Sequence, residues 1–324
     1  GSVSDRIFIG VGWPYANGSL HLGGIAGAYL PADIFARFHR LRGNQVLMVS
    51  GTDQHGTPVT IRAEQEGLTP QQVVQKYHQE NLSVWERLGI TFDRYTSTGT
   101  DNHRAVVHDI FLKLLERDLI YKQPGQYAYC DFDRRFLPDR YVEGTCPHCG
   151  GDKARGDQCE NCGKPLDPQD LRDWRCRTCG NPPVMRESEH FFLRLSALQS
   201  SLERWVTSAG GERWRPNVYR FTQGWLAEGL RDRAITRDID WGVPVPVPGY
   251  DEKRIYVWFE AVCGYLSAAV EWAAARGEPD AWCAFWQDPA CRGFYFIGKD
   301  NIAFHTIIWP AMIMGYGAYD AALG

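Results

Sequence analysis

Two short apolar runs separated by an amphipathic stretch constrain the fold more than any other feature of this sequence. RIFIGVG (6–12) and NQVLMVSG (44–51) are rich in Ile, Val, Leu and Phe and contain almost no charge, which is typical of strands buried on both faces. Between them, IAGAYLPADIFARFHRLRG (25–43) has apolar residues three and four positions apart, as an amphipathic helix does. A strand, a helix and a strand of these lengths predict a right-handed parallel crossover.

The loops that follow these two strands have unusual compositions. WPYANGSLHLGG (13–24) follows the first strand, and the second strand ends in GTDQHG (51–56). Ligands of parallel sheets bind outside the carboxyl ends of the strands, where both loops are expected to lie. Glycines at the start of a helix let backbone N–H groups approach an anion closely. The first loop matches neither a Walker loop nor GxGxxG, so its residues alone fit either a phosphate site or a simple turn before a helix.

The pattern changes twice further along the chain. From about 64 to 118 it is helical, and two stretches in it are amphipathic, QQVVQKYHQENLSVWERLGI and HRAVVHDIFLKLLERDLI. Residues 120–190 are rich in Cys, Gly, Asp, Arg and Pro and have no long apolar period. Helices are predicted to resume over about 191–232. We therefore interpret the segment 120–190 as an insertion that bound metal stabilises.

Two apolar runs near the end of the chain predict two more buried strands, each followed by a helix. They are IYVWF (255–259) and FYFIG (294–298). We therefore expect an α/β protein with a doubly wound parallel sheet of the Rossmann type, split by a central insertion. The predicted parts are the first half of this Rossmann-type domain over 1–118, a connective insertion over 119–235 with knuckles at about 130–180, and the second half of the domain over 236–324.

Composition and charge limit the class of protein. The chain has 324 residues, 44% of them hydrophobic, which is enough for a sizeable core. The net charge of −4 gives no general electrostatic attraction to nucleic acid, and the seven arginines against four acidic residues in 203–237 fit a solvated face. No run of 18 apolar residues occurs, so no membrane span is expected. The start at Gly1-Ser2, without Met, resembles a cleaved tag, and no secretory signal is present.

Cysteines are concentrated in the insertion. Seven of the ten lie between Cys130 and Cys179, and six of these form three C-x-x-C pairs. Such pairs without a signal peptide indicate metal binding in a reducing compartment, and they predict a cytoplasmic protein. Two pairs thirteen residues apart can supply the four thiolates that structural zinc requires. These four residues are Cys146, Cys149, Cys159 and Cys162.

A second metal site is predicted from the third pair, Cys176 and Cys179. Its partners would come from CDFD, where Cys130 and Asp133 have the same spacing with a carboxylate in the second place. Carboxylates are legitimate zinc ligands, so a Cys₃Asp site is one interpretation. The alternative is an empty knuckle held by packing alone. Both sites would be closed, which indicates structural metal rather than catalytic metal.

Several ordered motifs resemble the class I aminoacyl-tRNA synthetases, and most closely the methionyl-tRNA synthetase family. HLGG after the first strand, GTDQHG after the second and the knuckled insertion all match. Further matching stretches are WPYANG (13–18), LPADIFARFHRLRG (30–43), FLPDRYVEGTCPHC (136–149), RDIDWGVPVP (237–246), YVWFEAVCGY (256–265) and GKDNIAFH (298–305). The resemblance covers nearly the whole chain.

The resemblance implies a reaction and its substrates. In this family the carboxylate of L-methionine attacks the α-phosphate of ATP with Mg²⁺, and the methionyl-adenylate then passes methionine to the 3′ end of tRNA(Met). HLGG is similar to the family's HIGH signature, so His21 would donate a hydrogen bond to a phosphate oxygen, beside Gly23 and Gly24. Gly24 replaces the second histidine of that signature. In GKDN, Asp300 would contact the ribose or adenosine, with Lys299 and Asn301 beside it.

The resemblance also implies a methionine site. Asp53 matches the acid that meets the substrate ammonium, although an acid after a strand could equally cap a helix. Trp258, Val262 and Tyr265 recur at i, i+4 and i+7 on one helical face, which by periodicity alone indicates core. By the resemblance, the pocket wall consists of Tyr15, Trp258, Tyr265 and His305, with Trp13 and Val262 at further lining positions that vary within the family.

The chain departs from the family at its end. The family has a KMSKS loop after another strand, and its lysines neutralise the departing pyrophosphate, but no Lys or Arg follows Lys299 here. We expect the last strand, this loop and the helical anticodon-binding domain to be absent from the chain, which would then form adenylate slowly and bind tRNA weakly. Two other readings stay open: a truncated paralogue that activates an amino acid outside translation, or a catalytically inactive zinc-bearing binding module.

Overall fold

Four parallel strands form the sheet at the centre of the fold. The computed structural model describes residues 4–164 and 166–317. The strand order is β14-β1-β2-β3, and Ile9 of β1 pairs with Phe294 on one side and Met48 on the other. This is the order of a doubly wound sheet, and the order reverses between β1 and β14. The strands are β1 (Arg6–Val11), β2 (Gln45–Thr52), β3 (Arg94–Ser97) and β14 (Arg292–Phe296).

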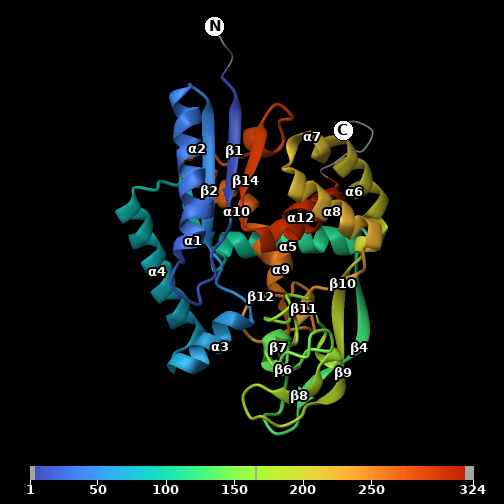
Figure 1. The fold of residues 1–324 in the computed structure, drawn as a ribbon. Helices are drawn as coiled ribbons and strands as arrows, with labels where there is room; N and C mark the ends of the chain where they lie inside the picture. The colour runs from blue at the N-terminus through green and yellow to red at the C-terminus, as the bar shows by residue number, and fades with distance from the viewer. Residues whose placement is uncertain (1–3, 165, 318–324) are drawn as a thin grey trace.

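Helices cover both faces of this sheet (Figure 1). None of the helices described is long and apolar enough to cross a membrane. The α-helices are α1 (Leu22–Gly24), α2 (Leu30–Leu41), α3 (Thr57–Glu66), α4 (Pro70–Leu88), α5 (Asp101–Glu116), α6 (Gln199–Trp205), α7 (Gly211–Arg213), α8 (Pro216–Glu228), α9 (Val257–Ala261), α10 (Gly264–Ala275), α11 (Cys283–Trp286) and α12 (Trp309–Tyr316). The π and 3₁₀ segments are η1 (Ile25–Tyr29), η2 (Asp139–Tyr141), η3 (Pro168–Asp170), η4 (Leu195–Leu198), η5 (Val206–Gly210), η6 (Lys299–Asn301) and η7 (Phe304–Ile308).

Alternate residues of β1 and β2 enter two different cores, which is why both strands read as uninterrupted apolar runs. Ile7, Ile9 and Met48 pack with residues of α2 and with Trp85 of α4 on one face. Phe8, Leu47 and Val49 pack with Tyr265 and with two alanines of α10 on the other face. The predicted strand–helix–strand unit is confirmed, because α1, η1 and α2 follow one another directly between β1 and β2.

The segment between β3 and β14 builds three antiparallel sheets (Figure 1). The long strands β4 and β9 pair from Ile120–Leu193 to Tyr129–Val184. Phe191 and Leu193 of β9 share a buried cluster with α5 and α12, so the insertion and the catalytic half have a common core. The remaining strands are β4 (Ile120–Cys130), β5 (Arg135–Phe136), β6 (Val142–Thr145), β7 (Ala154–Arg155), β8 (Arg172–Cys176), β9 (Val184–Leu193), β10 (Arg233–Ala234), β11 (Thr236–Arg237), β12 (Val243–Pro244) and β13 (Arg254–Ile255).

Several predicted elements are wrong. The run 255–259 is not a buried strand: β13 ends at Ile255 and helix α9 follows, because a short apolar run does not distinguish a strand from a buried helix. The helix predicted over 103–120 ends at Glu116, and the helical region predicted from 191 begins inside β9. Strand β3, in the predicted helical region, was missed because it has only four residues.

The predicted domain boundaries stay an interpretation. The antiparallel sheet from β4 to β10 lies between Ile120 and Ala234, within the predicted insertion 119–235. Residues 1–3 of the first predicted half and 318–324 of the second lie outside the described residues.

The side chain of Trp13 fixes the loop after β1. Its ring lies between Gly51 at the end of β2 and Gly264 at the start of α10. A Cβ atom at Gly51 would lie 2.5 Å from Trp13 Cζ3, and one at Gly264 would lie 2.7 Å from Trp13 Cζ2. Only glycine at these two positions leaves room for the ring.

We predict that Gly51→Ala and Gly264→Ala each lower the free energy of unfolding by about 1–3 kcal/mol, because the added methyl group overpacks the ring. Urea unfolding measures the change. Gly224→Ala in α8 is the matched control: no atom lies within 4 Å of its Cβ position, so stability should stay the same or rise slightly. Three variants with equal stability would contradict the packing described for Trp13.

Candidate functional site

The loops after β1 and β14 meet at the edge of the sheet where the strand order reverses. The Gly12 N–H donates to the Phe296 carbonyl at 2.9 Å, which extends the pairing of β1 and β14 to the point where the two loops begin. His21 precedes α1 in an extended conformation with its side chain exposed, and a Cβ at Gly23 would touch nothing within 4 Å. Both features leave open space at the start of this helix. The structure therefore brings the HLGG loop and the GKDN loop to one edge.

The residues of GKDN form the short turn η6 at this edge. Its three residues, Lys299, Asp300 and Asn301, are all exposed. The Asn301 N–H donates to the Gly298 carbonyl at 3.0 Å, which closes the turn. The three residues of this turn are therefore accessible to solvent just beyond the carboxyl end of β14.

Asp53 is buried behind the loop that follows β1. Its backbone N–H donates to the Pro14 carbonyl at 2.8 Å, and its carbonyl accepts from Ala16 at 2.9 Å, so Tyr15 and Asp53 form a parallel bridge. Helix α3 begins after Gly56 without a side-chain cap, which excludes the helix-cap reading of Asp53. Burial first, and then the charge of Glu260, raise the pKa of the Asp53 carboxyl well above its usual range.

The segment from α9 to α10 holds three of the predicted methionine-site residues. Trp258 lies on α9, Val262 lies in the turn between the helices and Tyr265 lies on α10. A two-residue turn therefore interrupts the helix that the i, i+4 and i+7 spacing indicates. Val262 and Cys263 nevertheless keep near-helical dihedral angles, with φ of −66° and −64°. Val262 and Tyr265 are buried, and Trp258 is half-buried.

Trp258 and Tyr265 both contact the segment η7. The ring of Trp258 meets Phe304 edge-on, with centroids 4.6 Å apart. Tyr265 Oη lies 2.6 Å from His305 Nε2, and His305 Nδ1 lies 2.7 Å from the Asn301 carbonyl oxygen. Since a carbonyl only accepts, Nδ1 has the proton, and Nε2 accepts from the Tyr265 hydroxyl. Burial lowers the pKa of His305 to about 4, so this imidazole is neutral near pH 7.

Arg233 lies against the rings of Trp258 and Trp225. Its guanidinium carbon is 5.1 Å from the ring centroid of Trp258 and 5.1 Å from that of Trp225. No carboxylate of the described residues forms an ion pair with it. Arg233 therefore links the insertion to the predicted pocket wall through cation–π contacts.

The sequence reasoning missed a group of buried polar residues beneath Asp53. Glu260 is fully buried, and its carboxylate accepts from His55 Nδ1 at 3.0 Å and from His103 Nε2 at 2.7 Å. His103 Nδ1 lies 2.7 Å from Ser267 Oγ. Burial raises the pKa of Glu260, but the two imidazoles outweigh it and the pKa is lowered. The one available signal was a single acid inside the apolar run IYVWFEAVCGY.

Two groups of metal-ligand side chains converge in the insertion. One consists of Cys146, Cys149, Cys159 and Cys162, and the other of Cys130, Asp133, Cys176 and Cys179. In each group the ligand atoms all lie within 4.8 Å of one another, and all ten cysteines of the chain are free. The structure therefore assembles both predicted ligand sets.

Distances and backbone amides in these groups suit thiolate ligands. The Sγ atoms of Cys146 and Cys162 are 3.8 Å apart, and those of Cys149 and Cys159 are 3.7 Å apart. In the other group, Cys176 Sγ lies 3.2 Å from Asp133 Oδ2. Backbone N–H groups donate to the sulfur of four of the cysteines, as at thiolates with negative charge. These four are Cys130, Cys146, Cys149 and Cys159.

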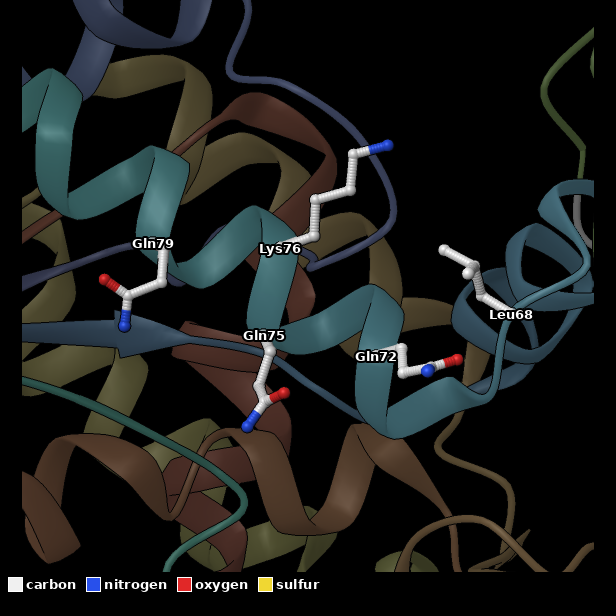
Figure 2. A pocket seen from close by; sticks show the side chains of 5 residues that line it. All are labelled: Leu68, Gln72, Gln75, Lys76 and Gln79. Atoms are coloured by element: carbon white, nitrogen blue, oxygen red, sulfur yellow. The ribbon is translucent and has the colours of Figure 1, made fainter.

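A separate shallow pocket lies along α4, far in the sequence from these residues. Figure 2 shows its lining, which consists of Leu68, Gln72, Gln75, Lys76 and Gln79. It shares no residue with the loops at the edge of the sheet and contains no acid, histidine or cysteine. We therefore do not regard it as the functional site.

Comparison with known proteins decides the family. The family profile described as tRNA synthetases class I (M) matches residues 7–322. The chain belongs to this family. It is 62% identical over 318 residues to the methionine–tRNA ligase of Dehalococcoides mccartyi strain CBDB1, covering 98% of this chain and 57% of that protein. It is 56% identical over 314 residues to the methionine–tRNA ligase of Thermomicrobium roseum, covering 97% of this chain and 53% of that protein.

Solved structures give the same result for the fold. The crystal structure of Mycobacterium tuberculosis methionyl-tRNA synthetase bound by methionyl-adenylate superposes with a TM-score of 0.72 at 25% sequence identity. The match covers 96% of this chain and 55% of that chain. The chain thus spans about half the length of its synthetase relatives and corresponds to their catalytic region. The resemblance seen in the sequence is confirmed.

We predict that His305 makes stability depend on pH. In the unfolded chain a histidine has a pKa near 6.5, whereas the folded pKa is about 4. The neutral form is therefore favoured by folding. Its contribution is complete above pH 6.5 and is lost as the pH falls toward 4.

The comparison is urea unfolding at pH 7 and pH 4.5. The free energy of unfolding should fall by about 1–2 kcal/mol more in the unmodified chain than in His305→Gln, which cannot be protonated. His21→Gln, at an exposed histidine, should behave as the unmodified chain does. An identical pH dependence in all three proteins would contradict the half-buried, neutral state of His305.

Proposed function

We propose that this chain is the catalytic portion of a methionine–tRNA ligase. The whole protein would activate L-methionine with ATP to methionyl-adenylate and pyrophosphate, and then transfer methionine to tRNA(Met). The observation that supports this most directly is the parallel pairing of β1 with β14 and with β2, because the HLGG, GKDN and Asp53 loops begin at the adjacent carboxyl ends of these three strands. A nucleotide and an amino acid could thus bind at adjacent places on one edge of the sheet.

ATP is assigned to the loops after β1 and β14. The start of the helix at HLGG offers backbone N–H groups to phosphate oxygens, with the His21 imidazole as a further donor. Gly23 and Gly24 leave room for the phosphates, and Asp300 would bind the ribose or adenosine beside Lys299 and Asn301. The substrate carboxylate oxygen forms a bond to the α-phosphorus as the bond to pyrophosphate breaks. Mg²⁺ bound with ATP supplies positive charge to the phosphate oxygens.

Methionine is assigned to the adjacent pocket. Its ammonium group would pair with the Asp53 carboxylate, and its side chain would lie against aromatic rings. A thioether gains ~0.3–1.5 kcal/mol from each favourable aromatic contact. The proposed wall consists of Tyr15, Trp258, Tyr265 and His305, with Trp13 and Val262 alongside.

Transfer to tRNA(Met) is proposed for the whole protein. This chain covers only 57% and 53% of the length of two relatives, so the rest of such a protein would take part in the transfer. The replacement of a HIGH histidine by Gly24 removes one imidazole donor. His21, the helix start and the GKDN turn would then supply the phosphate contacts. We place this activity in the cytoplasm, in keeping with the unpaired cysteines.

Calorimetric titration with amino acids tests the proposal. The chain should bind L-methionine more tightly than L-leucine or L-isoleucine, which lack the thioether. Asp53→Ala should weaken methionine by about 30-fold or more, because the buried ammonium loses its charge partner, while ATP affinity stays the same. Asp101→Ala, at an exposed acid, is the control. Equal affinity for the three amino acids would refute the assignment of methionine.

Zinc is the metal that best fits the two ligand groups. Four thiolates at zinc–sulfur distances of about 2.3 Å in a tetrahedron lie about 3.8 Å apart, close to the separations of 3.7 and 3.8 Å found here. Three thiolates and a carboxylate form an equally acceptable set. Because each group offers four protein ligands and no open position, we assign both ions a structural role.

Elemental analysis should find two zinc ions per chain. Asp133→Ala should lower the count to one, because it removes the fourth ligand of its group, whereas Asp131→Ala should leave it at two. Asp131 is exposed and ion-pairs with Arg186 instead of entering the group. An unchanged count in Asp133→Ala would exclude the carboxylate as a ligand, and no zinc at all would refute both sites.

A further inference from the structure

Glu260 is a buried carboxylate with no assigned role, directly beneath the proposed ammonium site. Neither oxygen reaches solvent, and each accepts from one imidazole: Oε1 from His55 and Oε2 from His103. A buried carboxylate is costly unless it is hydrogen-bonded, and these two imidazole donors meet that requirement.

The hydrogen bonds assign the protons of this group. Because a carboxylate only accepts, His103 Nε2 has a proton and donates it to Glu260, while His103 Nδ1 lies 2.7 Å from Ser267 Oγ. His55 Nδ1–H donates to the other oxygen. Each oxygen of the Glu260 carboxylate therefore has one imidazole N–H donor.

His55 connects this charge to Asp53. Its ring binds Glu260, and its backbone N–H donates to Asp53 Oδ1 at 3.3 Å. The rest of the loop is fixed as well, because Trp241 Nε1 donates to the Gln54 carbonyl at 2.7 Å and the Gln54 N–H donates to Thr98 Oγ1 at 2.9 Å. Loss of the Glu260 carboxylate would therefore release the His55 ring, and movement of His55 would change the orientation of the Asp53 carboxylate.

The carboxylates of Glu260 and Asp53 differ in the number of hydrogen-bond donors that they already have. Glu260 has a donor on each oxygen, whereas Asp53 has one backbone donor on Oδ1. No donor of the described residues reaches Asp53 Oδ2. A cationic group at that oxygen is favoured, because its charge offsets the burial and the repulsion from Glu260 that otherwise raise the pKa of Asp53, and an ammonium matches the site in size and donors.

We propose that Glu260 is a positioning residue for the substrate ammonium: through His55 it orients the Asp53 carboxylate, and it adds a second negative charge behind it. This inference rests on the proposed function. It predicts that Glu260 contributes to binding of the ammonium and contributes nothing to binding of the methionine side chain or of ATP.

The test compares two ligands in Glu260→Gln, a variant of the same size without the charge. L-methionine has the ammonium, and 4-(methylthio)butanoic acid is the same molecule without it. Calorimetry measures methionine and ATP, and NMR titration of the S-methyl resonance measures the acid. Methionine affinity should fall by about 10- to 100-fold, the range known for outer groups that orient metal ligands, while affinities for the acid and for ATP stay within about twofold.

Three further variants separate positioning from structural support. Glu271→Gln is the matched control, since Glu271 lies in α10 and binds Arg94 and Thr96 instead of the imidazoles; methionine affinity should not change. His55→Ala breaks the link and removes the donor to Glu260 Oε1; where circular dichroism shows it folded, it should reproduce the selective loss even if Glu260→Gln does not fold. His55→Asn, whose amide can replace the Nδ1 donor, should restore most of the affinity.

Equal losses for methionine and the acid in Glu260→Gln or His55→Ala would overturn the inference, because a merely structural residue would affect both. No loss of methionine affinity in either variant would overturn it as well. If the unmodified chain binds neither ligand, the proposed function itself fails and the inference fails with it.

Discussion

The pairing of β1 with β2 on one side and β14 on the other is the constraint on which the rest of the structure depends. All three strands are parallel, so their carboxyl ends lie at one edge, and the strand order reverses between β1 and β14. The loops after β1 and β14 meet there, although some 280 residues separate them along the chain. A site that holds a nucleotide and an amino acid side by side needs such convergence of distant segments.

The insertion enters the chain after β3 and is fixed to the catalytic half by charge as well as by the shared core. Asp238 follows β11, and its carboxylate binds His190 of β9 at 2.9 Å and Lys253 at 2.7 Å. Burial raises the pKa of Asp238, but these two partners outweigh it and lower the pKa to about 2. On the opposite side, Arg237 pairs with Asp139 at 3.2 Å and lies over Tyr256, just before α9. The knuckles are thus tied to the helix that presents Trp258 and Glu260.

Local patterns in the sequence predicted the strands and the metal-ligand groups whose formation depends on residues close together in the chain. The apolar runs of β1 and β2 and the C-x-x-C spacing each reflect a requirement met within a few residues, burial on two faces or tetrahedral thiolates. The run IYVWF was misread because a five-residue apolar stretch fits a strand and a buried helix equally.

The polar group around Glu260 could not be found in this way. Its members come from the loop after β2, from α5 and from the α9–α10 segment, so only the tertiary fold brings them together. The same holds for the bond between Tyr265 and His305, which joins residues 40 positions apart.

The central claim is that one edge of the sheet binds the amino acid and the nucleotide together. A crystal structure of the chain with a non-hydrolysable methionyl-sulfamoyl-adenosine tests it most directly. The account predicts the amine within hydrogen-bonding distance of Asp53 Oδ2, the sulfamoyl group over the HLGG loop and the ribose beside Asp300. The analogue bound elsewhere, for example along α4, or bound with its amine away from Asp53, would contradict the account.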